Sequence, residues 1–127
     1  MAKFYKCDIC GNLFNTILDS EVVPSCCGQE MTQLEAGAVD AAQEKHVPVV
    51  EREGNMVTVK VGSVPHPGTE EHFIQFVALE LDACGAVQIV KLTPEDDPVA
   101  YFSVCDPDAK VTAYAFCNLH GLWEAKG

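Results

Sequence analysis

Cysteine and histidine are the residues of this sequence best suited to do chemistry, and they are unevenly spaced. Four of the seven cysteines lie within the first 27 residues, at Cys7, Cys10, Cys26 and Cys27. Cys7 and Cys10 form a Cys-x-x-Cys pair, whose thiolates can face one ion while nearby backbone amides donate to the sulfurs. A tetrahedral site needs two more thiolates, which Cys26 and Cys27 offer. The spacing therefore predicts a four-cysteine metal site.

The spacing leaves the metal of this site open between structural zinc and iron, because thiolates bind both. The adjacent pair Cys26-Cys27 is nevertheless unusual for a zinc ribbon, which normally presents a second Cys-x-x-Cys pair. Gly28 follows the pair, and a residue without Cβ suits a tight backbone turn.

A second group of possible ligands lies further along the chain. The four histidines are all at or near a predicted loop or strand end: His46, His66, His72 and His120. A single histidine is more often a surface or hydrogen-bonded residue than a ligand. Cys117-x-x-His120, however, has the spacing of a chelating pair at a strand end, and imidazole with thiolate suits iron, copper and zinc. This spacing also leaves the metal open.

Two kinds of structure are expected to position these groups. Residues 1–36 are too few and too poor in large apolar side chains to fold by burial alone, so disulfides or a metal must hold them together. In a reducing cytosol, clustered cysteines more often hold a metal than form disulfides. After His46 the pattern changes to alternation, as at Val57, Val59 and Val61, which predicts a β-hairpin with residues 47–53 across a Gly54-Asn55 turn. Four more strands are predicted at Phe73–Leu81, Ala86–Leu92, Val99–Val104 and Val111–Cys117. Six short strands indicate an antiparallel sandwich or barrel.

The charge of the chain restricts its partners. Eight Lys and Arg against 19 Asp and Glu give a formal net charge of −11, which argues against nucleic acid and anionic membranes as partners. An enzyme with this charge that acted on a small anion would need a local cation at its site. No apolar run is long enough to span a bilayer, and the N-terminus lacks a signal-peptide pattern, so we expect a cytoplasmic protein.

Several motifs together resemble one known family. Four of them are similar in order and spacing to the catalytic signature of superoxide reductases: Glu44-Lys45-His46-Val47-Pro48, His66-Pro67, Glu71-His72 and Cys117-Asn118-x-His120-Gly121. The paired Cys26-Cys27 is similar to the desulforedoxin module, whose four-cysteine iron carries one electron. The sequence thus resembles the two-iron desulfoferrodoxins over essentially its whole length.

The resemblance implies a mainly β protein with two domains and two iron ions. Residues 1–36 would be a desulforedoxin-like knuckle whose iron is held by four cysteines. Residues 37–127 would be an immunoglobulin-like antiparallel β-sandwich whose iron is held by four histidines and one cysteine. The histidines would form the equatorial plane of this second iron, with Cys117 axial and the sixth position open to solvent: His46, His66, His72 and His120.

The resemblance also implies an activity, the one-electron reduction of superoxide to hydrogen peroxide without release of oxygen. Lys45 would be the local cation that attracts superoxide and helps to protonate the product, and Glu44 would occupy the sixth position in the ferric resting state. A rubredoxin-like electron donor and a homodimer are expected on the same basis.

Three residues fall outside the family pattern. Gly68 stands where the family usually has Met, and Cys84 and Cys105 are predicted to be buried free thiols. Three other functions compete with the reductase: a non-enzymatic, rubredoxin-like electron carrier fused to a metal-binding β-domain, a zinc-ribbon interaction module, and a superoxide dismutase.

Overall fold

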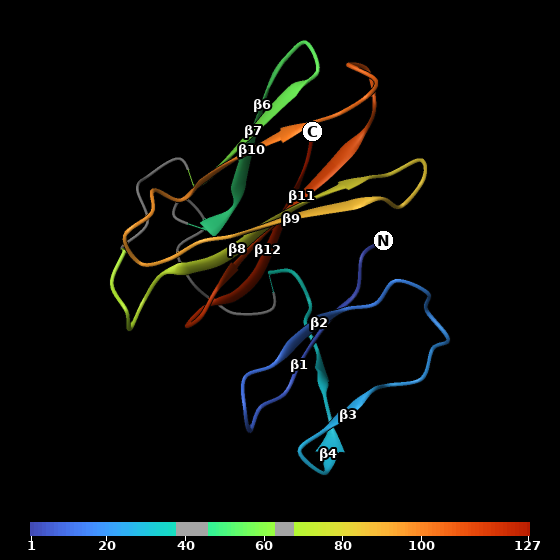
Figure 1. The fold of residues 1–127 in the computed structure, drawn as a ribbon, viewed down its shortest axis with the longest axis vertical. Coiled ribbons are helices and arrows are strands. Elements are labelled where there is room, and N and C mark those ends of the chain that lie inside the picture. Colours follow the sequence, from blue (N-terminus) through green and yellow to red (C-terminus); the bar gives the residue numbers. More distant parts are fainter. Residues whose placement is uncertain (38–45, 63–67) are drawn as a thin grey trace. The chain divides into compact units, whose positions relative to one another are not determined.

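The computed structural model describes residues 1–37, 46–62 and 68–127, which divide into two compact units. The units are Met1–Glu35 and Ala36–Gly127, so the division falls one residue before the boundary expected from the sequence (Figure 1). No helix among the described residues has the length and apolar character needed to cross a membrane.

The first unit is built from five very short strands. Strands β1 (Phe4–Lys6), β2 (Leu13–Asn15) and β5 (Thr32–Gln33) form an antiparallel sheet in the order β2-β1-β5. Strands β3 (Ser25–Cys26) and β4 (Gln29–Glu30) form a separate hairpin. The described core cluster of this unit consists of Tyr5, Cys7 and Met31, with Cys26 packed against it. Such a core is too thin to stabilise the unit by itself.

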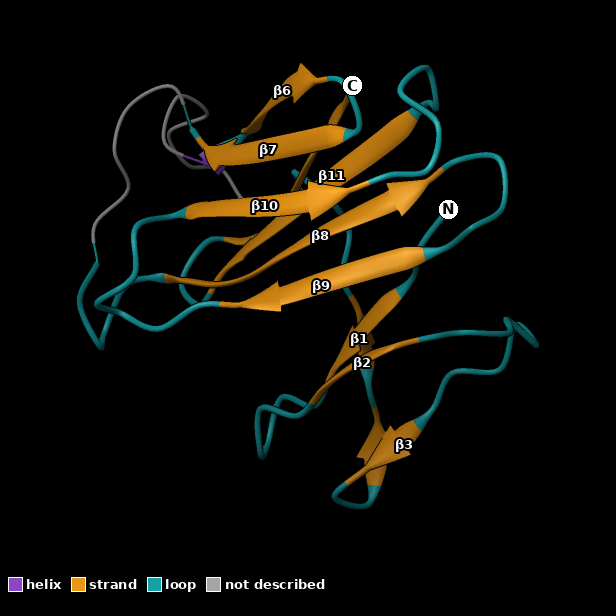
Figure 2. Cartoon of the chain, turned by 45° about the horizontal axis from the view of Figure 1, so that its top comes forward, coloured by secondary structure: helices purple, strands orange, loops and turns teal. Residues whose placement is uncertain are grey.

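The second unit is a β-sandwich of two antiparallel sheets. Strands β6 (Pro48–Glu53), β7 (Met56–Val61) and β10 (Val99–Ser103) form one sheet in the order β10-β7-β6. The other sheet has the order β12-β11-β8-β9 and consists of β8 (Ile74–Leu81), β9 (Val87–Lys91), β11 (Val111–Cys117) and β12 (Gly121–Lys126). Figure 2 shows β7 beside β10 and β8 beside β9. The mainly β prediction, with a four-cysteine knuckle and an antiparallel sandwich, is confirmed.

Alternating apolar side chains from both sheets fill the sandwich. Val57, Val59 and Val61 of β7 are buried in the same cluster as the inward-facing residues of β8 and β11. On β11 the inward stripe ends at Cys117, which is fully buried. The period of two along this strand therefore places a thiol at the edge of the hydrophobic core.

The six predicted strands are all present, and the predicted hairpin turn is confirmed. Glu53 pairs with Met56 across Gly54 and Asn55, and Gly54 has a φ of 59°, which fits the first position of a type II′ turn. Strand β12 was not predicted. Four of its six residues, Gly121, Glu124, Ala125 and Lys126, are of types depleted in strands.

The prediction that Cys84 and Cys105 are buried is wrong. Both thiols are exposed, Cys84 in the turn between β8 and β9, and Cys105 just after β10. Cysteine is often buried because it behaves as a small hydrophobe, but these two lie outside the alternating core positions of the strands.

Candidate metal centres

The four N-terminal cysteines come together from two tight turns. Cys7 follows β1 and Cys10 lies in the turn before β2, where Gly11 N–H donates to the Cys7 carbonyl over 2.9 Å. The other two cysteines lie on the β3–β4 hairpin, whose two-residue loop is Cys27-Gly28. Cys27 and Gly28 have φ values of 54° and 78°, the left-handed pair of a type I′ turn. This turn lets adjacent cysteines face one point.

The distances within this cluster fit a single tetrahedral ion. The four sulfur atoms lie within 4.8 Å of one another. Cys10 Sγ is 3.6 Å from Cys26 Sγ, which is 4.0 Å from Cys27 Sγ. Four sulfurs at about 2.3 Å from a central ion would be about 3.8 Å apart. A four-thiolate site for iron or zinc is therefore built into this unit.

Protonation supports the same conclusion. The backbone N–H of Cys10 donates to Cys7 Sγ over 3.4 Å and is the main cause that lowers the pKa of Cys7 to about 6. The hydrogen bond between the thiols of Cys10 and Cys27 is the main cause that raises the pKa of Cys27 to about 12. The crowded sulfurs therefore do not all ionise at neutral pH by themselves. A bound cation would displace the remaining protons.

The second cluster collects residues from three distant segments of the sandwich. His46 precedes β6, His72 precedes β8, Cys117 ends β11, and His120 lies in the loop that leads into β12. The loop after Cys117 has three residues and is followed by Gly121 with a φ of 77°, the left-handed residue typical of this hairpin class. The hairpin returns His120 to the side of Cys117.

The ligand atoms of the described members of this cluster converge. His120 Nδ1 lies 3.0 Å from His46 Nε2, 3.2 Å from His72 Nε2 and 3.8 Å from Cys117 Sγ. Imidazole nitrogens at about 2.1 Å from one ion are about 3.0 Å apart when they are adjacent at right angles. The distances therefore fit His120 between His46 and His72 around one ion. A soft thiolate among imidazoles suits iron, copper or zinc.

The sulfur of Cys117 is prepared to be a ligand. Burial raises the pKa of Cys117, while the backbone N–H groups of Leu119 and His120 donate to the sulfur and oppose that rise. These amides stabilise a thiolate that would otherwise be costly to bury, and a metal ion would complete its neutralisation.

Trp123 packs against two members of the cluster, and sequence reasoning missed it. Its ring stacks on His46 with centroids 5.2 Å apart, and its Nε1–H donates to the His120 carbonyl over 3.0 Å. His46 and Trp123 are 2% and 5% exposed, so the indole shields this side of the cluster from water. Trp123 lies two residues after Gly121 of the ligand motif, and this position could have indicated that it contacts the site. The signal was missed because β12 was not predicted to be a strand.

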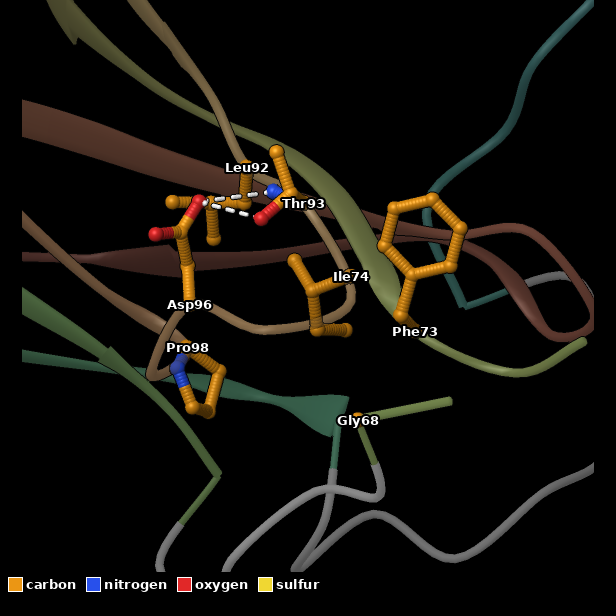
Figure 3. Close-up of a pocket in the computed structure, with 7 residues that line it drawn as sticks. All are labelled: Gly68, Phe73, Ile74, Leu92, Thr93, Asp96 and Pro98. Carbon is orange, nitrogen blue, oxygen red and sulfur yellow. Dashed lines mark hydrogen bonds between the residues drawn. The ribbon is translucent and has the colours of Figure 1, made fainter. Parts of the chain in front are cut away.

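Three predicted site residues lie outside the described residues, namely Glu44, Lys45 and His66. Gly68, the departure from the family pattern, borders a cavity of about 10 Å³, roughly the size of one water molecule. Figure 3 shows the turn beside this cavity, where Thr93 donates from its N–H and hydroxyl groups to Asp96. A Cβ atom on Gly68 would lie 2.6 Å from the Pro94 carbonyl oxygen. The close approach of residue 68 to this turn therefore excludes a methionine unless the backbone moves.

Comparison with known proteins connects both clusters to one group. The desulfoferrodoxin family profile matches residues 38–126. A desulfoferrodoxin homolog from Archaeoglobus fulgidus is 46% identical over 97% of this chain and 95% of its own length. The crystal structure of the superoxide reductase from Treponema pallidum matches with a TM-score of 0.79 and 36% identity, covering 98% of both chains. The 1Fe superoxide reductase from Giardia intestinalis matches with a TM-score of 0.58 and 35% identity, covering 66% of this chain and 97% of its own.

Proposed function

This chain belongs to the desulfoferrodoxin family, and we propose that it is a superoxide reductase, an oxidoreductase that reduces superoxide by one electron and two protons to hydrogen peroxide. The observation that carries the proposal is the convergence of His46, His72 and His120 on the buried thiol of Cys117. This cluster lies in a sandwich that matches superoxide reductases along the chain.

We assign the two clusters to two irons with different tasks. Residues 1–36 form the desulforedoxin-like domain and residues 37–127 the catalytic domain. Four thiolates of the first domain hold one iron, and four imidazoles with one thiolate of the catalytic domain hold the other, with His66 as the fourth imidazole. When bound, the second iron would bind superoxide and supply the electron that reduces it. The fit of three described imidazoles and one thiolate supports this assignment.

The protein prepares this site in two ways. The backbone N–H groups of Leu119 and His120 donate to the Cys117 sulfur and favour its thiolate form. As a ligand, this thiolate would donate electron density to the iron, which would favour reduction of the substrate. Trp123 excludes water from the side of His46 and fixes the imidazole by stacking.

Charged groups next to His46 control access of the anion. With a net charge of −11, the chain as a whole repels superoxide, so a local cation must attract it. Lys45 takes this role and helps to supply a proton to the product. Glu44 would be a further protein ligand of the iron when superoxide is absent.

The decisive experiment measures products after anaerobic loading with iron. Superoxide is generated by pulse radiolysis in the presence of excess reductant, and hydrogen peroxide and oxygen are then quantified. We expect one hydrogen peroxide for each superoxide and no oxygen from the reaction. Release of one oxygen for every two superoxides would identify a dismutase. An electron carrier with a purely structural second site would not accelerate the loss of superoxide at all.

Partners and compartment are parts of the same proposal. We propose a rubredoxin-like electron donor, a homodimer and a cytoplasmic location. The cytoplasmic location agrees with the seven free cysteines, which need a reducing environment. Sedimentation equilibrium of the iron-loaded chain tests the dimer, and a single monomeric species would contradict it.

A further inference from the structure

Two of the three segments that carry the described ligands of the second cluster must be held in register for His72 to meet Cys117 and His120. One is the segment before β8, which carries His72, and the other is the β11–β12 loop, which carries Cys117 and His120. Phe73 and Asn118, which lie in these segments, are 45 residues apart in the sequence, so no local turn fixes the distance between them. A side chain between the segments does.

The amide of Asn118 bonds to the backbone on both sides of His72. Its Oδ1 accepts the N–H of Phe73 over 3.0 Å, and its Nδ2 donates to the carbonyl of Glu71 over 3.0 Å. The backbone N–H of Asn118 also donates to the Phe73 carbonyl over 3.3 Å. One residue beside a ligand of the loop therefore holds both peptide groups that flank a ligand of the other segment.

The regular strand ladder does not provide this alignment. Phe116 pairs with Phe76, but the next pair is Cys117 with Ile74, so Gln75 is left over and the register shifts at this point. A β-bulge of this kind bends its strand and interrupts the regular hydrogen bonding. The bonds of Asn118 begin where the regular pairing stops.

The residue type matches the task. A carboxamide carries an acceptor and a donor on one rigid plane, which is what a neighbouring N–H and carbonyl on the same strand require. An aspartate would lack the donor, and a serine hydroxyl is too short to reach both groups. The two bonds are therefore a specific feature of Asn118.

We propose that Asn118 is a positioning residue for the metal site, which fixes His72 at binding distance from Cys117 and His120. The inference rests on the proposed function, in that it requires the second cluster to bind a metal. It acts through the backbone of His72 and also lies beside the ligand sulfur, with Asn118 Oδ1 4.0 Å from Cys117 Sγ, and it does not itself bind metal or substrate.

The test is a cobalt(II) titration against a competing chelator, with Asn118→Ala compared with the unchanged chain. The cobalt bands of the four-cysteine site in the same molecule serve as the internal reference. Asn55→Ala is the matched control, because Asn55 Nδ2 also donates to a backbone carbonyl, that of Cys105 over 3.2 Å, away from the cluster. We expect Asn118→Ala to weaken cobalt binding at the second site by about 10- to 100-fold, the range for residues that orient metal ligands. The four-cysteine site should bind as before.

The outcomes separate this inference from the proposed function. A second-site affinity for Asn118→Ala within about threefold of that for Asn55→Ala would overturn the positioning role alone. A second cluster that binds no cobalt in the unchanged chain would overturn the metal site and this inference together. If Asn118→Ala does not fold, Asn118→Asp decides, because it keeps the acceptor and loses the donor, so that an intermediate loss is predicted and an unchanged affinity contradicts the proposal.

Discussion

The two ligand clusters differ in how much of the chain is needed to build them. The four-cysteine cluster uses two tight turns within 7–27, and two of its thiols, those of Cys10 and Cys27, are exposed. The histidine-cysteine cluster draws its described ligands from 46–120, and its buried members belong to a packed sandwich. The first site therefore depends on its metal for structure, whereas the second is formed by a fold that exists without it. The predictions below test this difference.

Removal of both metals should unfold one unit and leave the other intact. The described core of the first unit is the small cluster around Tyr5 and Met31, while the second unit has a continuous core between its two sheets. Hydrogen exchange followed by NMR on the metal-free chain should show unprotected amides in β1 and β5 and protected amides in β7, β8 and β11. Zinc addition should restore protection in the first unit. Protected β1 amides in the metal-free chain would refute the comparison.

Substitution of Cys117 should instead keep the fold of the second unit and remove its activity. Cys117→Ser should abolish acceleration of superoxide loss, because a buried hydroxyl is a poor replacement for the thiolate ligand. Iron should be lost from the second cluster only, and the sandwich should be destabilised by about 1–3 kcal/mol if the hydroxyl finds no partner. Metal analysis, optical spectra and stopped-flow kinetics measure these effects. Retention of iron and rate together would show that Cys117 is not a ligand.

This contrast also explains what the sequence predicts. The first cluster follows from Cys7-x-x-Cys10 and Cys26-Cys27, because its geometry is local and spacing encodes it. Alternation predicts the β6–β7 hairpin, and runs rich in Val, Ile, Phe and Tyr predict the four strands β8 to β11. Strand β12 was missed because four of its six residues are of types depleted in strands. The second cluster is set by strand pairing and by a register shift after Phe116, which no local pattern records. Spacing therefore predicted only the Cys117–His120 pair, and the complete ligand set came from family resemblance.

The three cysteines of the second unit also differ in burial. Composition predicts buried thiols at Cys84 and Cys105, yet both lie exposed in connections between strands. Cys117 is buried because it continues the inward stripe of β11. Strand phase, and not residue type, separates these cases.

A charge change near the second cluster should affect rate without affecting structure. Lys45→Ala is expected to lower the second-order rate constant with superoxide by about tenfold at low ionic strength, with a smaller effect at high salt. Lys60→Ala is the control, because it removes the same charge from β7, where Lys60 Nζ lies 2.9 Å from Glu51. Pulse radiolysis over a range of salt concentrations measures both rates. Equal rates for the two variants would remove Lys45 from the proposal.

A change at Trp123 should produce a smaller effect that is confined to the second unit. Trp123→Phe keeps an aromatic ring against His46 but leaves the His120 carbonyl without the indole N–H donor. We expect a loss of about 1–3 kcal/mol in the unfolding free energy of the sandwich and a shift in the reduction potential of its iron. The potential of the four-cysteine iron should stay the same. Equal shifts at both irons would show that the effect is not local.

The smallest effect is expected at the surface of the first unit. The hydrogen bond from Lys3 is the main cause that lowers the pKa of Asp19, and the same bond raises the pKa of Lys3 above 10.5. A lowered acid pKa stabilises the fold above about pH 4, and a raised lysine pKa stabilises it below about pH 10, so the pair contributes only between these limits. Asp19→Asn should therefore slightly lower the unfolding midpoint of the iron-loaded first unit at pH 7, and the difference should shrink as the pH rises above 10.5. The alkaline side is the one to measure, because acid also protonates the cysteine ligands. A difference that persisted at high pH would mean that Asp19 stabilises the unit through the bond that its Oδ1 accepts from the backbone N–H of Glu21 and not through Lys3.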